Sequence, residues 1–179
     1  MKVICISGKA QHGKDTTAGV LKGFLEDSGA KVVIIHYADL LKFICEKWFG
    51  WDGEKDSFGR SLLQRVGTDT IRAKEPNYWV NFVVELLKLF PNEWDYVIIP
   101  DCRFPNEINC MKDNFNTIHL RVFRNNFESP LSAEQQKHIS ETALDHVTPD
   151  LWIENSGDKE DLRANIIYLL KDIKKEVKK

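Results

Sequence analysis

A glycine-framed loop near the N-terminus is the feature that most constrains how this chain folds. Residues 8–17 read Gly-Lys-Ala-Gln-His-Gly-Lys-Asp-Thr-Thr, between an apolar run at residues 3–6 and a helical pattern from Ala18 onward. A strand, a glycine loop and a helix are the context that cradles a phosphate. The glycines let successive N–H groups and the helix N-terminus point at one anion, and a lysine adds positive charge. The pattern predicts an ATP site, with contacts from Gly8, Lys9, His12, Gly13, Lys14, Asp15 and Thr16.

Asp15 occupies the position where the usual pattern has Ser or Thr, whose hydroxyl binds Mg²⁺. Its carboxylate could hold the metal through a water, cap the helix N-terminus, or orient Lys14, and the sequence leaves these open. Asp101 ends a predicted buried strand, where a carboxylate often binds magnesium directly or through water. The alternative for Asp101 is an ion pair with Arg103. We expect Mg²⁺, with Asp15, Thr16 and Asp101 as candidate ligands.

Length and composition indicate one globular domain over residues 1–179. Hydrophobic residues make up 42% and charged residues 29%, which is ordinary for a soluble protein. The net charge of −2 argues against a nucleic-acid partner, which would favour a basic surplus. A local basic pocket for a small phosphorylated substrate remains compatible with that charge.

The cysteines and the apolar segments predict a cytoplasmic protein with no membrane partner. No apolar stretch approaches the ~20 residues of a membrane span, and the first apolar run is too short for a signal peptide. The cysteines show no metal-binding spacing, so we expect reduced thiols. They are Cys5, Cys45, Cys102 and Cys110.

Apolar runs alternate with helical patterns, which predicts an α/β fold with five strands, largely parallel. The helix expected at residues 78–90 is strongly apolar, and one of its faces carries Trp79, Phe82, Leu86 and Leu89. We predict that this face packs in the core. A site role for Trp79 is left open. Residues 124–141 are polar and predict a mobile flap or a long loop. The expected strands are 3–6, 31–36, 96–99, 117–122 and 151–153; the expected helices are 15–27, 40–49, 57–74 with a break near 67–68, 78–90, 105–113 and 158–179.

Four charged or glycine-rich segments follow predicted strands and should converge, because ligands of open α/β sheets bind beyond the carboxyl ends of strands. Phosphoryl transfer requires cations around the moving group. Lys14, Arg103, Arg121 and Arg124 could serve there, with Asp101, as the catalytic set. Arg65 and Arg72 could grip an acceptor phosphate, since guanidinium pairs with two phosphate oxygens. Each arginine could equally be a surface ion-pair partner.

Several segments taken in order resemble the deoxynucleoside monophosphate kinases encoded by tailed phages. The resemblance spans roughly residues 3–157, and its most specific parts are Gly-Lys-Asp-Thr at 13–16 and Asp-Cys-Arg-Phe-Pro-Asn-Glu at 101–107. The other matching segments are Tyr37-Ala38-Asp39 with Lys42, Leu62-Leu63-Gln64 with Gly67-Thr68-Asp69, Trp79-Val80, and His138-Ile139-Ser140-Glu141 with Asp145.

This resemblance implies an enzyme that moves the γ-phosphate of ATP to a deoxynucleoside monophosphate with Mg²⁺, in the host cytoplasm if viral. It implies a P-loop nucleoside-monophosphate-kinase fold, a three-layer sandwich with a five-stranded parallel sheet. A monophosphate-binding insert at about residues 39–80 and a lid at about 121–145 would complete it. Asn155 and Gly157 would lie beneath the adenine. The implied substrate-binding residues are Asp39, Lys42, Arg65, Arg72, Trp79, Arg103, Glu141 and Asp145.

Two alternatives remain at this stage, and the accepted bases, deoxyribose selectivity and a homodimer are left open. The Gly-Lys-Asp loop, the Ser-Glu-x3-Asp run at 140–145 and Ile-Glu-Asn-x-Gly at 153–157 also resemble animal-type phosphomevalonate kinase. The segment with Leu-Leu-Gln at 62–64, Gly-Thr-Asp at 67–69 and Trp-Val at 79–80, in the acceptor region, weighs against that acceptor. The other alternative is a nucleotide-binding regulatory protein without turnover, which only Asp15 favours.

Overall fold

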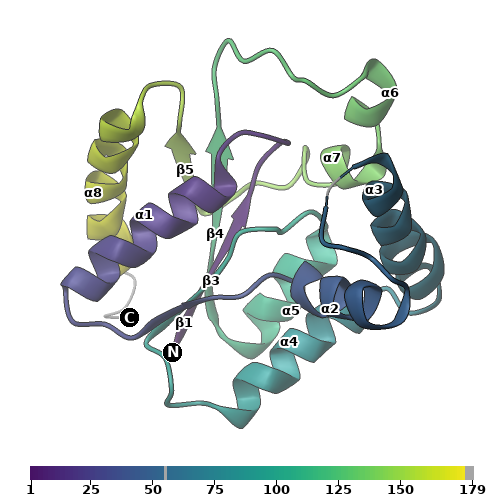
Figure 1. Cartoon of the computed structure of the whole chain (residues 1–179). Coiled ribbons are helices and arrows are strands. Elements are labelled where there is room, and N and C mark those ends of the chain that lie inside the picture. The colour runs from purple at the N-terminus through teal and green to yellow at the C-terminus, as the bar shows by residue number, and fades with distance from the viewer. Residues whose placement is uncertain (55, 176–179) are drawn as a thin grey trace.

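A parallel five-stranded sheet forms the centre of the computed structural model, which describes residues 1–54 and 56–175 (Figure 1). The strand order is β2-β3-β1-β4-β5, and every neighbouring pair is parallel. This arrangement confirms the predicted α/β class and the five strands. The strands are β1 Lys2–Ser7, β2 Val32–Ile34, β3 Tyr96–Ile99, β4 Asn116–Phe123 and β5 Leu151–Glu154.

Helices cover both faces of the sheet and form the predicted three layers. Alternate residues of β1 serve the two faces: Ile4 and Ile6 pack in the core under α1 and α8, whereas Val3 and Cys5 pack in the core with α4 and α5. All four are fully buried, which explains why β1 is continuously apolar. The helices are α1 Lys14–Asp27, α2 Ala38–Trp48, α3 Ser57–Gln64, η1 Arg65–Arg72, α4 Tyr78–Leu89, α5 Pro105–Asn114, α6 Ala133–Gln136, α7 Ile139–Thr142 and α8 Lys159–Lys175.

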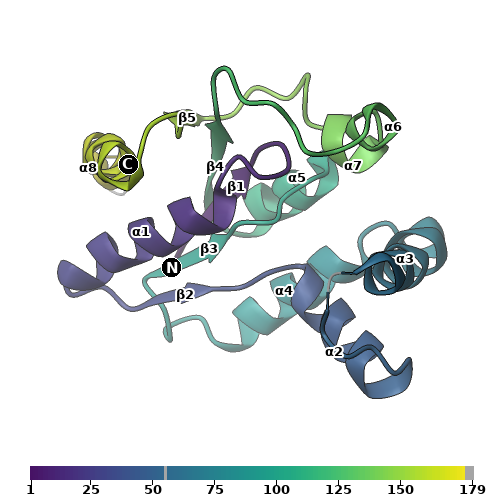
Figure 2. The ribbon, with the colours of Figure 1, turned by 45° about the horizontal axis from the view of Figure 1, so that its top comes forward.

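Two groups of short helices lie toward the same side of the molecule, beyond the carboxyl ends of the strands. One group, α2, α3 and η1, connects β2 to α4, and the other, α6 and α7, connects β4 to β5. Figures 1 and 2 show α3 and the α6–α7 pair on that side in both views. The stretch at 124–141, expected as a flap or long loop, thus carries two short helices.

The predicted helix at 57–74 does not break near Gly67. The chain passes from the α-helix α3 into the π-helix η1 without leaving helical geometry. The Ala73 N–H donates to the Thr68 carbonyl, the i→i+5 contact of a π-turn. Gly67 fits inside this helix because a Cβ there would lie 2.5 Å from Leu41 Cδ2. The glycine therefore serves close packing of two helices and not a break.

The predicted core face of α4 is wrong. Trp79 is buried, but Phe82 is 45% exposed and Leu89 is 74% exposed. Because α4 is apolar on nearly all sides, its sequence does not mark which stripe faces the sheet. Packing in the core selects a stripe that starts at Trp79 and includes Val80, Val83, Val84 and Leu87.

Strand β2 ends at Ile34, earlier than predicted, because the His36 N–H donates to the Asp39 carboxylate and not to a neighbouring strand. The next two N–H groups, of Tyr37 and Ala38, donate to the Asp101 carboxylate. Helix α2 then begins at Ala38. The predicted helix end at residue 179 lies outside the described residues.

The expectation of reduced cysteines is confirmed, since all four are free thiols. Across residues 1–54 and 56–175, no helix combines the length and the apolar character that crossing a membrane requires.

His119 of β4 is a fully buried polar residue beneath the site end of the sheet. Its Nε2 lies 2.7 Å from Ser7 Oγ, and its backbone N–H donates to the Asp150 carboxylate at 2.7 Å. Burial, followed by the charge of Arg121, lowers the pKa of His119 to about 4. The folded protein therefore holds this imidazole neutral.

We predict that His119 makes folding stability fall as the pH falls from 6.5 to 4. In that window His119 binds a proton in the unfolded chain but not in the folded chain, so the free energy of unfolding decreases as the pH falls. Chemical denaturation across this range should show about 3 kcal/mol less decrease for His119→Gln than for wild type. The exposed His146 provides the control, since His146→Gln should leave the pH slope unchanged. Equal slopes in wild type and His119→Gln would contradict the neutral assignment.

Candidate active site

The loop between β1 and α1 adopts a conformation that its two glycines make possible. Gly8 has φ +152°, and a Cβ there would lie 2.4 Å from the Val122 carbonyl oxygen. Gly13 has φ +91°, and a Cβ there would lie 2.1 Å from Asn155 Nδ2. No side chain caps α1 at Gly13, so amides of its first turn remain available to an anion. This geometry fits the predicted phosphate loop.

Lys14 lies within the loop and is held over it by backbone oxygens. Its Nζ donates to the Gly8 carbonyl at 2.9 Å and to the Lys9 carbonyl at 3.0 Å. Burial, then the charge of Arg103, lowers the pKa of Lys14 to about 8. The amine is thus a largely desolvated cation, and phosphate oxygens would favour its charged form.

Asp15 does not cap α1, because the N-cap residue is Gly13. Its side chain is 83% exposed, and Oδ1 lies 3.2 Å from His36 Nε2. Lys14 is oriented by carbonyls and not by this carboxylate. The structure thus disfavours capping and the orientation of Lys14 as roles of Asp15, and metal binding through a water, with the exposed Thr16 beside it, stays a prediction.

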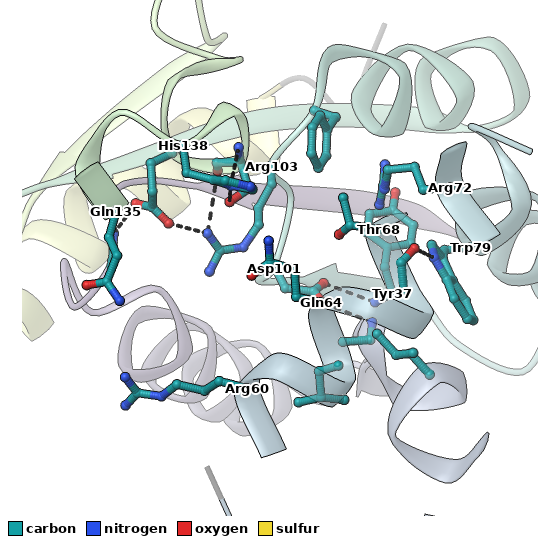
Figure 3. Close-up of a pocket in the computed structure, with 18 of the residues that line it drawn as sticks. Tyr37, Arg60, Gln64, Thr68, Arg72, Trp79, Asp101, Arg103, Gln135 and His138 are labelled. Atoms are coloured by element: carbon teal, nitrogen blue, oxygen red, sulfur yellow. Dashed lines mark hydrogen bonds and ion pairs between the residues drawn. The ribbon is translucent and has the colours of Figure 1, made fainter. Parts of the chain in front are cut away.

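The Asp101 carboxylate is fixed by backbone amides. Oδ1 accepts the Tyr37 N–H and Oδ2 accepts the Ala38 N–H, both at 3.0 Å (Figure 3). Burial raises the pKa of Asp101, and the two amide bonds oppose that rise. The alternative pairing with Arg103 is wrong, since Arg103 pairs with Glu141. Among the described residues, no three His, Cys, Asp or Glu side chains form a group that could hold a metal ion.

A large cavity of about 770 Å³ opens between the end of β3, the helices α2, α3 and η1, and the α6–α7 segment. Figure 3 shows Asp101 and Arg103 at its centre, with Trp79 and Arg72 on one side and Gln135 and His138 on another. Trp79 is held against the wall by a hydrogen bond from Nε1 to the Gly67 carbonyl at 3.1 Å. Of the residues predicted from sequence, the cavity brings together Lys42, Arg72, Trp79, Asp101, Arg103 and Glu141.

A small cavity of about 240 Å³ lies beside the phosphate loop, and Arg103, Ser140 and Glu141 line both cavities. Glu141 Oε2 accepts the Ala10 N–H of the loop at 2.9 Å, and Oε1 pairs with Arg103. Lys9 Nζ pairs with Asp145 Oδ1 at 2.5 Å and donates to the Glu141 carbonyl at 2.6 Å. The α7 segment is thus bonded to the phosphate loop through groups that could bind phosphate.

Arg121 and Arg124 lie at the edges of the site. Arg121 donates from Nε to Ser7 Oγ at 3.4 Å and from Nη2 to the Leu144 carbonyl, and it lines the small cavity. Arg124 stacks on Phe127, 4.5 Å from the ring centroid. Its backbone N–H lies 3.3 Å from Nδ1 of His12 in the phosphate loop. Each arginine has partners within the described chain, so a role for either toward phosphate stays a prediction.

Asn155, Gly157, Asp39 and Arg65 lie outside the two cavity linings. Asn155 Nδ2 donates to the His12 carbonyl at 2.9 Å, which supports the phosphate loop. Gly157 packs against Asp161, at the start of α8. Asp39 pairs with Lys42 at 3.3 Å, while Arg65 is exposed on η1. Ligand contacts by these four stay predictions.

Glu107 is a buried carboxylate that the sequence motif contained but that we did not assign to the site. Its side chain is 2% exposed, and Oε1 pairs with Arg72 at 2.6 Å. Oε2 accepts the Arg103 N–H at 2.7 Å and the Phe104 N–H at 3.0 Å. Arg72 also stacks on Phe104, 4.2 Å from the ring centroid. This network joins η1 to the turn that carries Arg103.

Arg72, predicted above, belongs to a row of side chains on α3 and η1 whose other members were missed, although a four-residue spacing marks the row in the sequence. In an α-helix, residues four apart drift around the axis because a turn holds 3.6 residues. The wider π-turns of η1 drift the opposite way and keep the row on one wall of the large cavity. The row consists of Arg60, Gln64, Thr68 and Arg72 (Figure 3).

A sequence model of the deoxynucleotide monophosphate kinase family matches residues 46–166, more than half of the chain. The chain belongs to this family. The family's enzyme from Enterobacteria phage T4 is 33% identical over 114 residues, and that from Escherichia phage RB69 is 30% identical over 114 residues. Each alignment covers 63% of this chain, which spans about 45% of the T4 protein and 44% of the RB69 protein.

Solved structures of other kinases share the fold of this deoxynucleotide monophosphate kinase family member. Shikimate kinase from Aquifex aeolicus has a TM-score of 0.53 at 13% identity, covering 96% of this chain and 97% of that one. The Mycobacterium tuberculosis APS kinase in complex with AMPPNP and APS has a TM-score of 0.51 at 11% identity, covering 95% and 97%. At these identities the likeness shows the fold alone.

We predict that nucleotide binding near pH 8.5 is coupled to proton uptake by Lys14. In the free protein the Lys14 amine is partly deprotonated at that pH, because the pKa of Lys14 is about 8. Bound phosphate oxygens should raise that pKa. Calorimetry in buffers of different ionisation enthalpy should give uptake of roughly 0.5–0.8 proton per nucleotide. Lys14→Arg is the control, because its guanidinium stays protonated. Equal uptake in both proteins would assign the proton to another group.

Proposed function

We propose that this chain transfers the γ-phosphate of ATP to a deoxynucleoside monophosphate and releases ADP and a deoxynucleoside diphosphate. The observation that carries the proposal is the position of Arg103, which lines both the cavity beside the phosphate loop and the large cavity. A donor bound on the loop and an acceptor in the large cavity would meet at this guanidinium. Family membership supports the acceptor class.

On the donor side, the loop amides and Lys14 would bind the phosphates of ATP. Magnesium would be held by Asp15 and Asp101, with Thr16 beside them. These oxygen donors fit magnesium, because Mg²⁺ in kinases takes one or two carboxylates together with substrate phosphates. Bound there, the ion would neutralise charge that develops on the phosphates during transfer.

On the acceptor side, residues 39–80 would bind the monophosphate and residues 121–145 would form a lid. Lys42 and Arg60 offer cations at the large cavity. Trp79 and Phe104 offer aromatic surfaces for the base and sugar. Gln64 and Thr68 offer the hydrogen-bonding groups that a base edge requires.

At the point of transfer, Arg103 would stabilise charge on the moving phosphoryl group, with its planar fork held between the two substrates. Its present partner Glu141 would exchange places with phosphate oxygens as the substrates bind. The same exchange would free the Ala10 amide. Phosphate binding would thereby be coupled to movement of the lid, because the groups that hold the lid, Arg103 and the Ala10 amide, are the groups that would bind phosphate.

The phosphomevalonate alternative shares the donor site and differs in the acceptor. The family match at residues 46–166 extends through most of the proposed acceptor insert, which favours a nucleotide. The non-catalytic alternative loses weight because Arg103 lines both cavities, Asp101 lines the large one, and Lys14 is close enough to Arg103 for that charge to lower the Lys14 pKa.

The test is a coupled assay of ADP release with ATP and Mg²⁺ against a panel of dNMPs, NMPs and phosphomevalonate. We expect turnover with dNMPs. Lys14→Ala should lower kcat/KM about 100- to 1,000-fold, because the substitution removes a charged hydrogen-bond donor to the phosphates of ATP. Lys88→Ala, at the far end of α4, should retain wild-type turnover.

Turnover with phosphomevalonate alone would overturn the acceptor and keep the donor site. ATP binding without ADP release toward any acceptor would overturn transfer itself. Wild-type activity in Lys14→Ala would contradict the phosphate-loop assignment.

A further inference from the structure

One short segment, residues 36–38, holds both carboxylates that could meet magnesium. The backbone amides of Tyr37 and Ala38 bind Asp101, as described above. The imidazole of the preceding residue, His36, reaches Asp15 at the start of α1, with Nε2 at 3.2 Å from Oδ1. Asp101 follows β3 and Asp15 lies in α1, far apart in sequence, and the connection between β2 and α2 bridges them.

The orientation of the His36 ring is set from its other side. Nδ1 lies 3.5 Å from Asp39 Oδ2, and the His36 backbone N–H donates to that same oxygen at 2.9 Å. Asp39 is held in turn, because its Oδ1 pairs with Lys42 at 3.3 Å. A histidine whose one nitrogen faces a carboxylate presents the other nitrogen in a fixed direction.

Asp15 needs an orienting partner more than the Ser or Thr that usually occupies this position in a phosphate loop. A Ser or Thr hydroxyl is placed by one torsion, whereas an Asp carboxylate has a second, broad torsion. The Asp15 side chain is largely exposed, and His36 is its hydrogen-bonding partner in the described chain. Without that contact the carboxylate would sample several directions, and ordering it would cost part of the metal-binding free energy.

We propose that His36 is a positioning residue that aims the Asp15 carboxylate at the nucleotide-bound metal. The inference rests on the proposed function for the presence of a metal–nucleotide complex. The inference deepens that proposal, because it assigns His36 as the orienting partner of Asp15, the residue that stands in place of Ser or Thr. Outer contacts of this kind change metal affinity by about 10- to 100-fold.

The same contacts connect the donor site to the acceptor site. They run from Asp15 through His36 and Asp39 to Lys42, which lines the large cavity. An acceptor phosphate bound to Lys42 would change the partner of Asp39 and thus the support of His36. Metal affinity measured with an acceptor analogue should therefore differ from that without it.

The experiment measures binding and needs no turnover. Mn²⁺ replaces Mg²⁺, and electron paramagnetic resonance reports free Mn²⁺ in the presence of protein and a non-hydrolysable ATP analogue. His36→Leu should weaken Mn²⁺ binding in this complex about 10- to 100-fold. His36→Gln, which keeps a terminal N–H donor, should recover a substantial part. His146→Leu, at an exposed histidine, should bind as wild type does.

A second measurement separates positioning from damage. Affinity for the analogue in excess EDTA should be the same within about two-fold in wild type and His36→Leu, because the loop contacts to phosphate do not involve His36. Unchanged Mn²⁺ affinity in His36→Leu would overturn the proposal. Equal losses with and without metal would also overturn it. Neither result depends on phosphoryl transfer, so failure of the proposed reaction remains distinguishable.

Discussion

The buried ion pair between Arg72 and Glu107 is the interaction on which the arrangement of the large cavity depends. Glu107 also accepts the amides of Arg103 and Phe104, while the Tyr37 hydroxyl donates to its backbone carbonyl. The wall of the large cavity that η1 forms and the turn after β3 are therefore fixed to one another. Removing one partner of a buried pair costs about 3–5 kcal/mol, because the other charge stays buried and unpaired. The pair thus specifies geometry more than it adds stability.

Charge in the site is balanced by side chains of the chain itself. Lys9 faces Asp145, Arg103 faces Glu141, and Lys14 faces two carbonyls. Each of these cations could exchange its present partner for a phosphate oxygen without leaving the site. The acidic groups belong to the segment over the cavities, so phosphate binding and movement of that segment are coupled by electrostatics. If this segment is the proposed lid, its closure would exclude water while it completes the cationic surroundings of the transferring group.

The sequence predicted well what is local. The phosphate loop, the buried strands and the ends of α1 follow from apolar runs and glycines that act within a few residues of one another. Features that depend on distant partners were missed. The exposed stripe of α4, with Phe82 and Leu89, is decided by packing in the core. The π-turns of η1 align Arg60 and Gln64 with Arg72, and an α-helical periodicity does not predict that alignment. Asp101 was assigned to the site from its place after a strand, but its amide partners, Tyr37 and Ala38, lie at the start of α2.

The central claim is that donor and acceptor sites adjoin across Arg103. The most direct test is binding of a bisubstrate compound, in which adenosine and a deoxynucleoside are joined through a chain of five phosphates. If the sites adjoin, calorimetry should give one compound per chain and affinity at least about 100-fold above that of ATP, because the second site binds at high effective concentration. Arg103→Ala should remove most of that gain. Affinity equal to that of ATP, or two compounds bound per chain, would contradict the account.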